Sequence, residues 1–315
     1  MTEEKQNRRA GVKAVHSLNR FVMSVPSLDE AESFYTTFGL DVRRSGGALE
    51  MRTFGHPHQW GTIVAGPRKR LEYLSFGIFE DEVSTFRERV ASSGVACEPH
   101  AASDGSGMWL RDPDGLPVQI VVAPNVCPTC KPAAAAAPAL AAGAAAAPAR
   151  SKVQPVKPRR MSHVLRFTPD VMRMVAFYRD LLGLKLSDHS GEIIAFMHAP
   201  HGSDHHIIAF AKSDRPGLHH TSWDVGSLEE VGLGSEQMRI KGYADGWGVG
   251  RHVLGSNYFY YVRDPWKGWC EYSFDIDYIP VDVEWRAGDH PPEDSVYVWG
   301  PPMHPEFITN HESPQ

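Results

Sequence analysis

The chain has 315 residues, of which 42% are hydrophobic, and its formal net charge is −6 at pH 7. That length suffices for two domains, each with a core of its own. The acidic balance and the lack of a basic run argue against nucleic-acid binding, and no apolar run is long enough to span a membrane. The charged N-terminus and the four cysteines predict a protein without a signal peptide or a disulfide framework, located in the reducing cytoplasm.

The first patterned region, residues 11–125, consists of two similar units. Each unit begins with a short strand, continues with an amphipathic helix and returns in strand-like runs. Ser27 and Glu30 form a capping-box pattern at the start of the first helix. In chain order, the expected elements include a strand at Ser17–Phe21, a helix from Leu28 to about Gly39, a strand at Leu71–Ile78, a helix at Glu80–Ser93 and a strand at Leu116–Val122.

Residues 126–160 form a linker of distinct composition. Of the 17 residues from Ala133 to Ala149, 13 are alanine, and Pro138 and Pro148 interrupt any helix that the alanines would favour. Such a segment is typical of a semi-extended connection between domains. Cys127 and Cys130 form a CxxC pair at its start, but no second pair follows, so we expect neither a zinc site nor redox chemistry there.

The second patterned region, residues 161–285, repeats the plan of the first, and residues 286–315 form a proline-rich tail that we expect to extend over the surface. The chain is therefore expected to be an α+β protein of four strand–helix–strand–strand–strand modules, paired into two similar domains. The expected elements of the second region include strands at Ser162–Phe167 and Leu218–Val225, a helix at Ser227–Lys241, and strands at Tyr258–Val262 and Trp269–Phe274.

Aligning the two regions by their sequence patterns distinguishes the residues that build the fold from the residues that are candidates for chemistry. Three positions change together, from apolar or aromatic residues in the first region to possible metal ligands in the second. Two imidazoles and one carboxylate form the facial triad that binds Fe(II) or Mn(II) and leaves coordination positions open for substrate and oxygen. The expected correspondences are Leu18 with His163, Tyr73 with His220, and Val118 with Glu271.

His219 and His220 compete for one position in that triad. Neighbours on a strand point to opposite faces, so only one of the two side chains is expected to reach the metal. The repeat pattern selects His220, which leaves His219 to pack behind it or to support it.

The second region resembles the catalytic domain of the type I extradiol ring-cleavage dioxygenases, in the vicinal oxygen chelate superfamily. The resemblance covers about residues 11–285, and its most specific part is the run Gly250-Arg251-His252, Tyr261, Asp264-Pro265, Gly268 and Glu271. It implies cleavage of a small catechol beside its two hydroxyls with Fe(II) and dioxygen, with Mn(II) as the alternative metal. We further expect a homo-oligomer. Because the first domain keeps the scaffold and has no metal ligands, we assign it to assembly and to packing against the second domain.

The resemblance also assigns roles to particular residues. It implies that His163, His220 and Glu271 hold the iron. His206 matches a histidine of the family that lies upstream of the second ligand, and His252 and Tyr261 match residues that hydrogen-bond the bound catecholate. A neutral imidazole suits such a site, because a catechol must lose a proton before it can chelate a metal.

Several aromatic residues are candidates for lining the substrate pocket, although each could equally belong to the core. Because Trp247 stands where relatives that take acidic catechols present arginine, we expect an uncharged catechol: an alkylcatechol, a 2,3-dihydroxybiphenyl-like diol or a trihydroxytoluene. Two other functions share the fold: a glyoxalase-like enzyme, whose ligands would come from both repeats, and a metal-free binding protein, which would need no triad. The aromatic candidates are Trp223, Tyr243, Trp247, Phe259 and Trp269.

Overall fold

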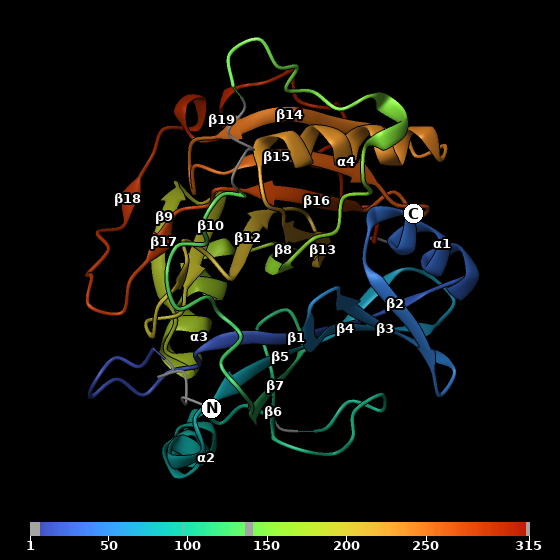
Figure 1. Cartoon of the computed structure of the whole chain (residues 1–315). Helices are drawn as coiled ribbons and strands as arrows, with labels where there is room; N and C mark the ends of the chain where they lie inside the picture. Colours follow the sequence, from blue (N-terminus) through green and yellow to red (C-terminus); the bar gives the residue numbers. More distant parts are fainter. Residues whose placement is uncertain (1–6, 97, 136–140, 313–315) are drawn as a thin grey trace, which may run out of the picture.

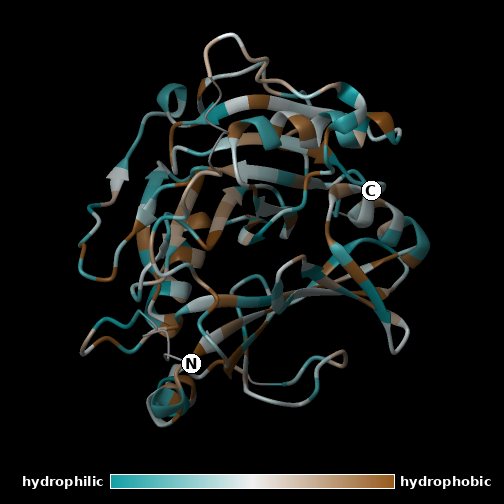
Figure 2. Ribbon diagram, viewed as in Figure 1, coloured by the Kyte–Doolittle hydropathy of each residue, from teal (hydrophilic) through white to brown (hydrophobic). Residues whose placement is uncertain are grey.

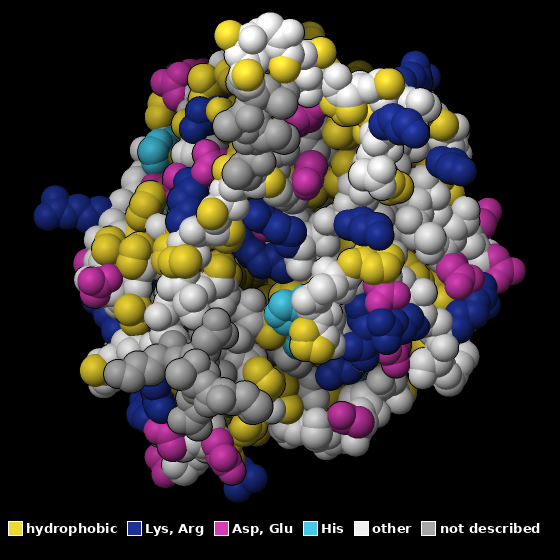
Figure 3. Space-filling model, viewed as in Figure 1, with side chains coloured by type: hydrophobic (Ala, Val, Ile, Leu, Met, Phe, Trp, Pro, Cys, Tyr) yellow, Lys and Arg dark blue, Asp and Glu magenta, His cyan; other side chains and the backbone are white. Residues whose placement is uncertain are grey.

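The computed structural model describes residues 7–96, 98–135 and 141–312, which form two large β-sheets with four α-helices in the described segments (Figure 1). The helices are α1 (Leu28–Phe38), α2 (Val83–Ser93), α3 (Val171–Leu182) and α4 (Leu228–Ile240). None of these helices is long and apolar enough to cross a membrane. Lys and Arg side chains are interspersed with Asp and Glu on the face seen in Figure 3.

The first sheet has the strand order β2-β3-β4-β1-β5-β7-β6. Its second module has two strands after the helix among the described residues, where the sequence predicts three, because residues 98–107 form turns, bends and irregular backbone. The strands are β1 (Ser17–Val25), β2 (Asp41–Ser45), β3 (Ala48–Thr53), β4 (His56–Ala65), β5 (Arg70–Ile78), β6 (Met108–Arg111) and β7 (Pro117–Val122).

The second sheet has the order β18-β9-β10-β12-β8-β13-β16-β15-β14-β19. Its strands are β8 (Arg160–Thr168), β9 (Lys185–Ser190), β10 (Ile194–His198), β12 (Ile208–Lys212), β13 (Gly217–Asp224), β14 (Gly246–His252), β15 (Tyr258–Arg263), β16 (Trp269–Phe274), β18 (Gly288–Asp289) and β19 (Tyr297–Trp299). A small separate pair joins β11 (Ser203–Asp204) to β17 (Tyr278–Ile279). Hydropathy alternates repeatedly along the strands of both sheets, as expected for strands with two different faces (Figure 2).

Local sequence explains the ends of the helices. The Ser27 hydroxyl accepts a hydrogen bond from the backbone N–H of Glu30, which bears out the predicted N-cap of α1. Gly39 ends α1 with a left-handed φ of 102°, and a Cβ at this position would lie 2.1 Å from the carbonyl oxygen of Val156. Any side chain at position 39 would therefore collide with the last part of the linker.

The register of the two sheets corrects two of the three correspondences expected from sequence. Arg20 pairs across β5 with Ser75, and Ser75 pairs with Gln119 on β7. The matching row in the second sheet runs from His163 through Ser222 to Glu271. The counterparts of His163 and Glu271 are therefore Arg20 and Gln119, not Leu18 and Val118. The sequence superposition missed this because it slipped by two residues on the first strand and by one on the last.

The third correspondence holds. Tyr73 lies opposite Val22, and His220 lies opposite Leu165, at equivalent positions of the two sheets. Each pair of central strands also has an irregular register at the equivalent place, between Leu71 and Tyr73 in the first sheet and between Leu218 and His220 in the second. The two halves thus share not only strand order but also the position of a β-bulge.

The two sheets are held against each other by buried contacts. Phe38 at the end of α1 stacks on Tyr272 of β16 with ring centroids 3.8 Å apart, and the Tyr272 hydroxyl donates to the Phe38 carbonyl at 2.8 Å. Buried ion pairs add to this interface: Arg166 with Asp112, and Lys69 with Asp264. Removing one partner of such a pair leaves a buried charge uncompensated, so these pairs constrain how the two halves dock.

The linker and the tail differ in how they associate with the sheets. In the linker, Val156 is buried, and the backbone N–H of Ala135 donates to the Gly226 carbonyl at 2.7 Å. The tail does more than extend over the surface, since it supplies both edge strands of the second sheet: β18 pairs with β9, and β19 pairs with β14. In the strand order of that sheet, these two strands are the first and the last.

Candidate active site

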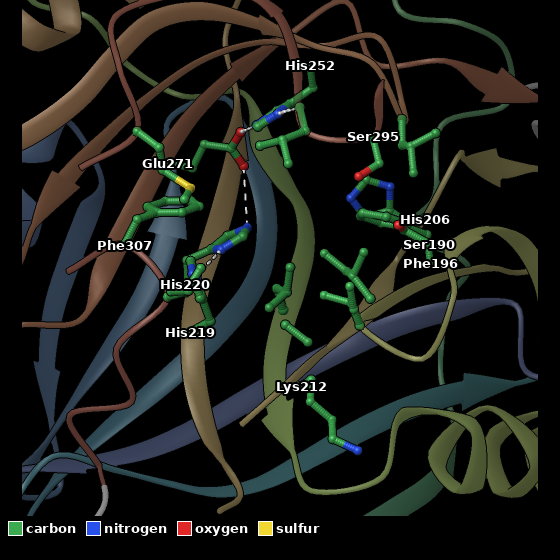
Figure 4. A pocket seen from close by; sticks show the side chains of 18 of the residues that line it. Ser190, Phe196, His206, Lys212, His219, His220, His252, Glu271, Ser295 and Phe307 are labelled. Carbon is green, nitrogen blue, oxygen red and sulfur yellow. Dashed lines mark hydrogen bonds and ion pairs between the residues drawn. The ribbon is translucent and has the colours of Figure 1, made fainter. Parts of the chain in front are cut away.

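A cavity of about 280 Å³ opens in the second domain (Figure 4). All its described lining residues come from the second sheet, its connections and the C-terminal tail, and none comes from the first sheet. The apolar part of the lining includes Leu165, Phe167, Ile194, Phe196, Leu254, Val296, Met303 and Phe307.

Three side chains with metal-binding atoms meet in the cavity wall. Nε2 of His163 lies 3.2 Å from Nε2 of His220, and Oε2 of Glu271 lies 3.3 Å from the first and 3.6 Å from the second. Of the groups of three or more possible metal ligands searched for among the described residues, these three form the one found, with their ligand atoms all within 4.8 Å of one another. They come from neighbouring strands β8, β13 and β16, which is why they lie together despite their separation in sequence.

The carboxylate of Glu271 is suited to a cation. The side chain is buried, and its Oε2 has no hydrogen-bond partner, whereas Oε1 accepts from the side-chain amide of Asn257 at 3.0 Å. Burial alone would raise the pKa of Glu271, but the neighbouring imidazoles of His163 and His252 outweigh it and lower the pKa. The site therefore keeps an anionic oxygen free, aimed at the two imidazoles, and a divalent cation fits that need.

A hydrogen bond to His163 and the burial of His220 keep both imidazoles in the neutral form. The hydroxyl of Ser162 donates to Asp204 at 2.8 Å, so its oxygen is free to accept from Nδ1–H of His163 at 3.2 Å. That hydrogen bond leaves Nε2 of His163 unprotonated on the side of Glu271, the form in which imidazole binds metals. Burial lowers the pKa of His220 well below its usual value, so this ring too is neutral.

His219 does not follow the expected alternation. The bulge after Leu218 makes His219 the extra residue of β13, and both His219 and His220 line the cavity. Their Nδ1 atoms lie 2.7 Å apart, and His219 also packs against Phe307 with ring centroids 4.7 Å apart. His219 thus contacts the back of the His220 ring rather than Glu271, which agrees with the supporting place expected for it.

His252 and Tyr261 form a hydrogen-bonded pair beside Glu271. Nδ1–H of His252 donates to the carbonyl oxygen of Val296 at 2.8 Å, so Nε2 accepts from the Tyr261 hydroxyl at 2.9 Å. Tyr261 lies directly across the strand pair from Glu271. Burial, followed by the charge of Glu271, raises the pKa of Tyr261 well above its usual value. The phenol is therefore a hydrogen-bond donor rather than a phenolate.

His206 lies just before β12, and its ring packs against that of His163 in a tilted arrangement with ring centroids 4.0 Å apart. Figure 4 shows it across the pocket from Glu271 and His220. Burial, followed by the neighbouring histidines His163 and His205, lowers the pKa of His206 well below its usual value. The ring is thus neutral and able to accept a proton. The six predicted site residues consequently surround one cavity, with the imidazole of His206 on the far side from the carboxylate.

The expected aromatic lining is wrong. None of the five candidates lines the cavity, and Trp247 instead stacks behind Tyr261 with ring centroids 5.6 Å apart. The rings that do line it are Phe167, Phe196 and Phe307. Strand alternation in sequence could not tell the two faces of the strands apart, because both faces of this sheet are covered.

Sequence reasoning also missed Asn257 and the tail. Asn257 joins Glu271 to Ser273, with hydrogen bonds of 3.0 Å to each. The tail contributes Phe307 to the cavity wall and the Val296 carbonyl that orients His252. Neither Asn257 nor the tail carries a periodic or motif signal, since Asn257 lies in the short connection before β15 and most of the tail is irregular. At the CxxC pair, Cys127 is half-buried, and burial raises the pKa of its thiol to about 12.

Comparison with known proteins places the chain in a family. A model of the Glyoxalase/Bleomycin resistance protein/Dioxygenase superfamily matches residues 160–272. Metapyrocatechase 2 from Cupriavidus necator is 50% identical over 301 residues, which cover 95% of this chain and 93% of that protein. The chain belongs to the extradiol ring-cleavage dioxygenases. This membership confirms the resemblance seen in the sequence, and the observed fold confirms the fold that the resemblance implied.

Two more distant matches also cover most of this chain. A manganese-dependent 2,3-dihydroxybiphenyl 1,2-dioxygenase from Geobacillus genomosp. 3 is 22% identical over 309 residues, 92% of this chain and 96% of that protein. A Mn(II)-bound glyoxalase from Novosphingobium aromaticivorans superposes with a TM-score of 0.71 at 23% identity, over 91% of this chain and 92% of that one. The structural likeness concerns the fold alone. The dioxygenase is metal-dependent and has a three-residue metal site, and it opens catechol-type rings.

Proposed function

We propose that this dioxygenase uses Fe(II), held by His163, His220 and Glu271, to open an uncharged, apolar-substituted catechol. The single observation that carries the metal site is the buried, unpartnered Oε2 of Glu271 between two imidazole nitrogens. When bound, a redox-active divalent cation would favour ionisation of the catechol and bring it together with dioxygen. Two imidazoles and one carboxylate suit Fe(II) and Mn(II) alike, and Mn(II) is the alternative to be tested.

We assign His206 to proton transfer. Its neutral ring lies across the cavity from Glu271, where a catechol between them would present a hydroxyl group to it. It can take the proton of that hydroxyl and return one later in the reaction. A positioned base of this kind contributes roughly 10²–10⁴-fold in rate.

His252 and Tyr261 are assigned to holding the substrate. The Val296 carbonyl keeps the His252 proton on Nδ1, and Tyr261 keeps its own proton because its pKa is raised. A catecholate oxygen close to them would accept the hydrogen bond that the Tyr261 hydroxyl otherwise donates to Nε2 of His252. The pair would thus exchange an internal hydrogen bond for one to the substrate and orient the ring.

The lining of the cavity supports an uncharged substrate. Lys212 is the one cationic side chain among the described lining residues, and Figure 4 shows it at the end of the pocket remote from Glu271. A carboxylate on the substrate would therefore lose its hydration shell on binding without gaining a nearby guanidinium as a partner, and such desolvation costs free energy. The volume of about 280 Å³ lies near the lower end of the range of roughly 300–1,000 Å³ common for small-molecule sites, so an alkyl or single aryl substituent is expected to fit.

Anaerobic purification followed by metal analysis tests this proposal. Apoprotein reloaded with Fe(II) should turn over catechols faster than apoprotein reloaded with Mn(II), measured by the absorbance of the yellow ring-opened product. Alkylcatechols and 2,3-dihydroxybiphenyl should have higher kcat/KM than catechols that carry a carboxylate. Equal activity with carboxylated substrates would contradict the assignment of substrate class, and full activity with Mn(II) alone would contradict the assignment of iron.

A further inference from the structure

A chain of hydrogen-bonded side chains leads from His206 away from the pocket. Nδ1 of His206 lies 3.1 Å from Nδ1 of His205, and Nε2 of His205 lies 2.8 Å from Oδ2 of Asp188. The other oxygen of Asp188, Oδ1, lies 2.9 Å from Nε2 of His290. Every contact in the series is within hydrogen-bonding distance.

The chain runs from the interior to solvent. His205 and His206 are buried, Asp188 is nearly so, and the side chain of His290 is 35% exposed. His290 follows β18, the tail strand that pairs with β9 beside Asp188. The tail therefore supplies His290, the solvent-exposed end of the series, while His206 at the other end lines the cavity.

The charge of Asp188 decides which group donates and which accepts in each hydrogen bond of the series. Its carboxylate also accepts from the backbone N–H of Gly288 at 2.8 Å. Burial would raise the pKa of Asp188, but hydrogen bonds from His205 and His290 outweigh it and lower the pKa to about 2. Because Asp188 is ionised, Nε2 of His205 carries the proton between them, and its Nδ1 is free to accept from Nδ1–H of His206. Nε2 of His206 is then left without a proton, as a base for the pocket.

The reaction needs an outlet for a proton. Both atoms of dioxygen enter the opened ring, and the hydroxyl-bearing carbon at the cleaved bond becomes a carboxylic acid. Acids of this type have pKa values of about 4, so one proton per ring opened is released at neutral pH.

We propose that His205, Asp188 and His290 form a proton path that connects His206 with bulk solvent and fixes the ring form of His206 that acts as a base. The inference rests on the role proposed above for His206. A proton taken up at Nε2 of His206 leaves through its Nδ1–H to Nδ1 of His205, whose Nε2–H then passes to Asp188. The exposed imidazole of His290 first changes ring form through solvent, so that its proton lies on Nδ1. Its Nε2 then accepts the proton of the carboxyl group while Nδ1–H is lost to water, which restores the Asp188 carboxylate.

His290 offers the test, because it lies outside the pocket and can be replaced chemically. In the metal-loaded His290→Ala enzyme at low buffer concentration, we expect kcat to fall on the order of tenfold, less than the roughly 10²–10⁴-fold typical of a group that contacts substrate. Free imidazole should restore kcat, since it can occupy the vacated position. Metal content and KM should stay the same. Proton release in a single turnover, followed with a pH-indicator dye, should slow in parallel with kcat.

His189→Ala is the matched control. His189 precedes Ser190 on β9 and is also partly exposed, but its Nδ1 lies 3.0 Å from the Gly191 carbonyl and takes no part in the series. This variant should retain both kcat and its independence of buffer. Asp188→Asn should slow turnover without rescue by imidazole, because the blocked step is internal.

Two results would overturn the proton path. The first is a His290→Ala enzyme that behaves like His189→Ala at every buffer concentration. The second is a loss of kcat that imidazole does not restore, which would mean that His290 only braces β18 against β9. Failure of the proposed function is recognised separately, as an unmodified enzyme that binds no metal or opens no catechol in any buffer.

Discussion

The two sheets contain the same row of positions with different side chains. The three positions hold Arg20, Tyr73 and Gln119 in the first sheet and His163, His220 and Glu271 in the second. Gln119 donates from its side-chain amide to the Ser106 carbonyl at 3.0 Å, so it is engaged with its own loop rather than with a central site. The paired modules therefore provide the geometry of a three-residue site twice, and the side chains turn one of the two into a metal site.

The surroundings of the two rows differ as well. Tyr73, the counterpart of His220, packs against Trp109 with ring centroids 5.0 Å apart and fills its own face of the sheet. Over the second row the tail forms a wall with Phe307, and a cavity remains between the wall and the sheet. A catalytic site here requires both donor atoms and an unfilled volume, and only the second domain has both among the described residues.

The largest expected effect is at Glu271. Glu271→Gln removes the anionic donor, so metal content after purification should fall close to zero and ring opening should be lost. The matched change Gln119→Ala in the first sheet should leave metal content unchanged. Metal analysis and circular dichroism on the same preparations check this, and a Glu271→Gln protein with full metal occupancy would contradict the comparison of the two rows.

The bulge in β13 provides a sharper version of the same comparison. His220→Ala should lose metal, whereas His219→Ala should retain most of it, because His219 contacts the back of the His220 ring rather than Glu271. The opposite result, with metal lost in His219→Ala and kept in His220→Ala, would exchange the roles of the two neighbours.

Next in size are the histidines that are not part of the triad. His206→Phe and His252→Phe should retain metal while turnover falls by roughly 10²–10⁴-fold, because a proton-transferring or orienting imidazole is removed. His100→Phe, beside Tyr73 in the first domain, should have no such effect. Metal content and single-turnover rates separate the outcomes. Parallel loss of metal and activity in His206→Phe would make it a ligand or a structural support.

A smaller effect is expected at Tyr261. Tyr261→Phe removes one hydrogen bond to the bound catecholate, which should weaken substrate binding by about 1 kcal/mol or somewhat more. The rise should be seen in the dissociation constant of the anaerobic substrate complex, with a smaller change in rate. Tyr260→Phe, at the preceding position, which does not line the cavity, should bind substrate normally. Equal weakening in both variants would argue against a specific contact.

The smallest effect is expected in the linker. Replacing residues 133–149 with a short Gly/Ser spacer removes the hydrogen bonds from Arg159 to Ala133 and from Ala135 to Gly226, so the melting temperature should fall slightly. Turnover per bound metal should be nearly unchanged, since the described part of the segment does not reach the cavity. A large decrease in turnover would mean that the alanine-rich segment orders the active domain or an oligomer.

The amino-acid sequence by itself predicted the repeated modules, the N-cap of α1 and the six candidate residues that meet at one cavity. These depend on local periodicity, turn residues and a motif, all of which are legible along one strand or helix at a time. Tertiary structure alone decided the register between strands, where one or two residues change the partner across the sheet. It also decided which aromatic rings line the cavity, and it brought Asn257, Phe307 and His290 to the site, because contacts between distant segments leave no periodic signal in either segment.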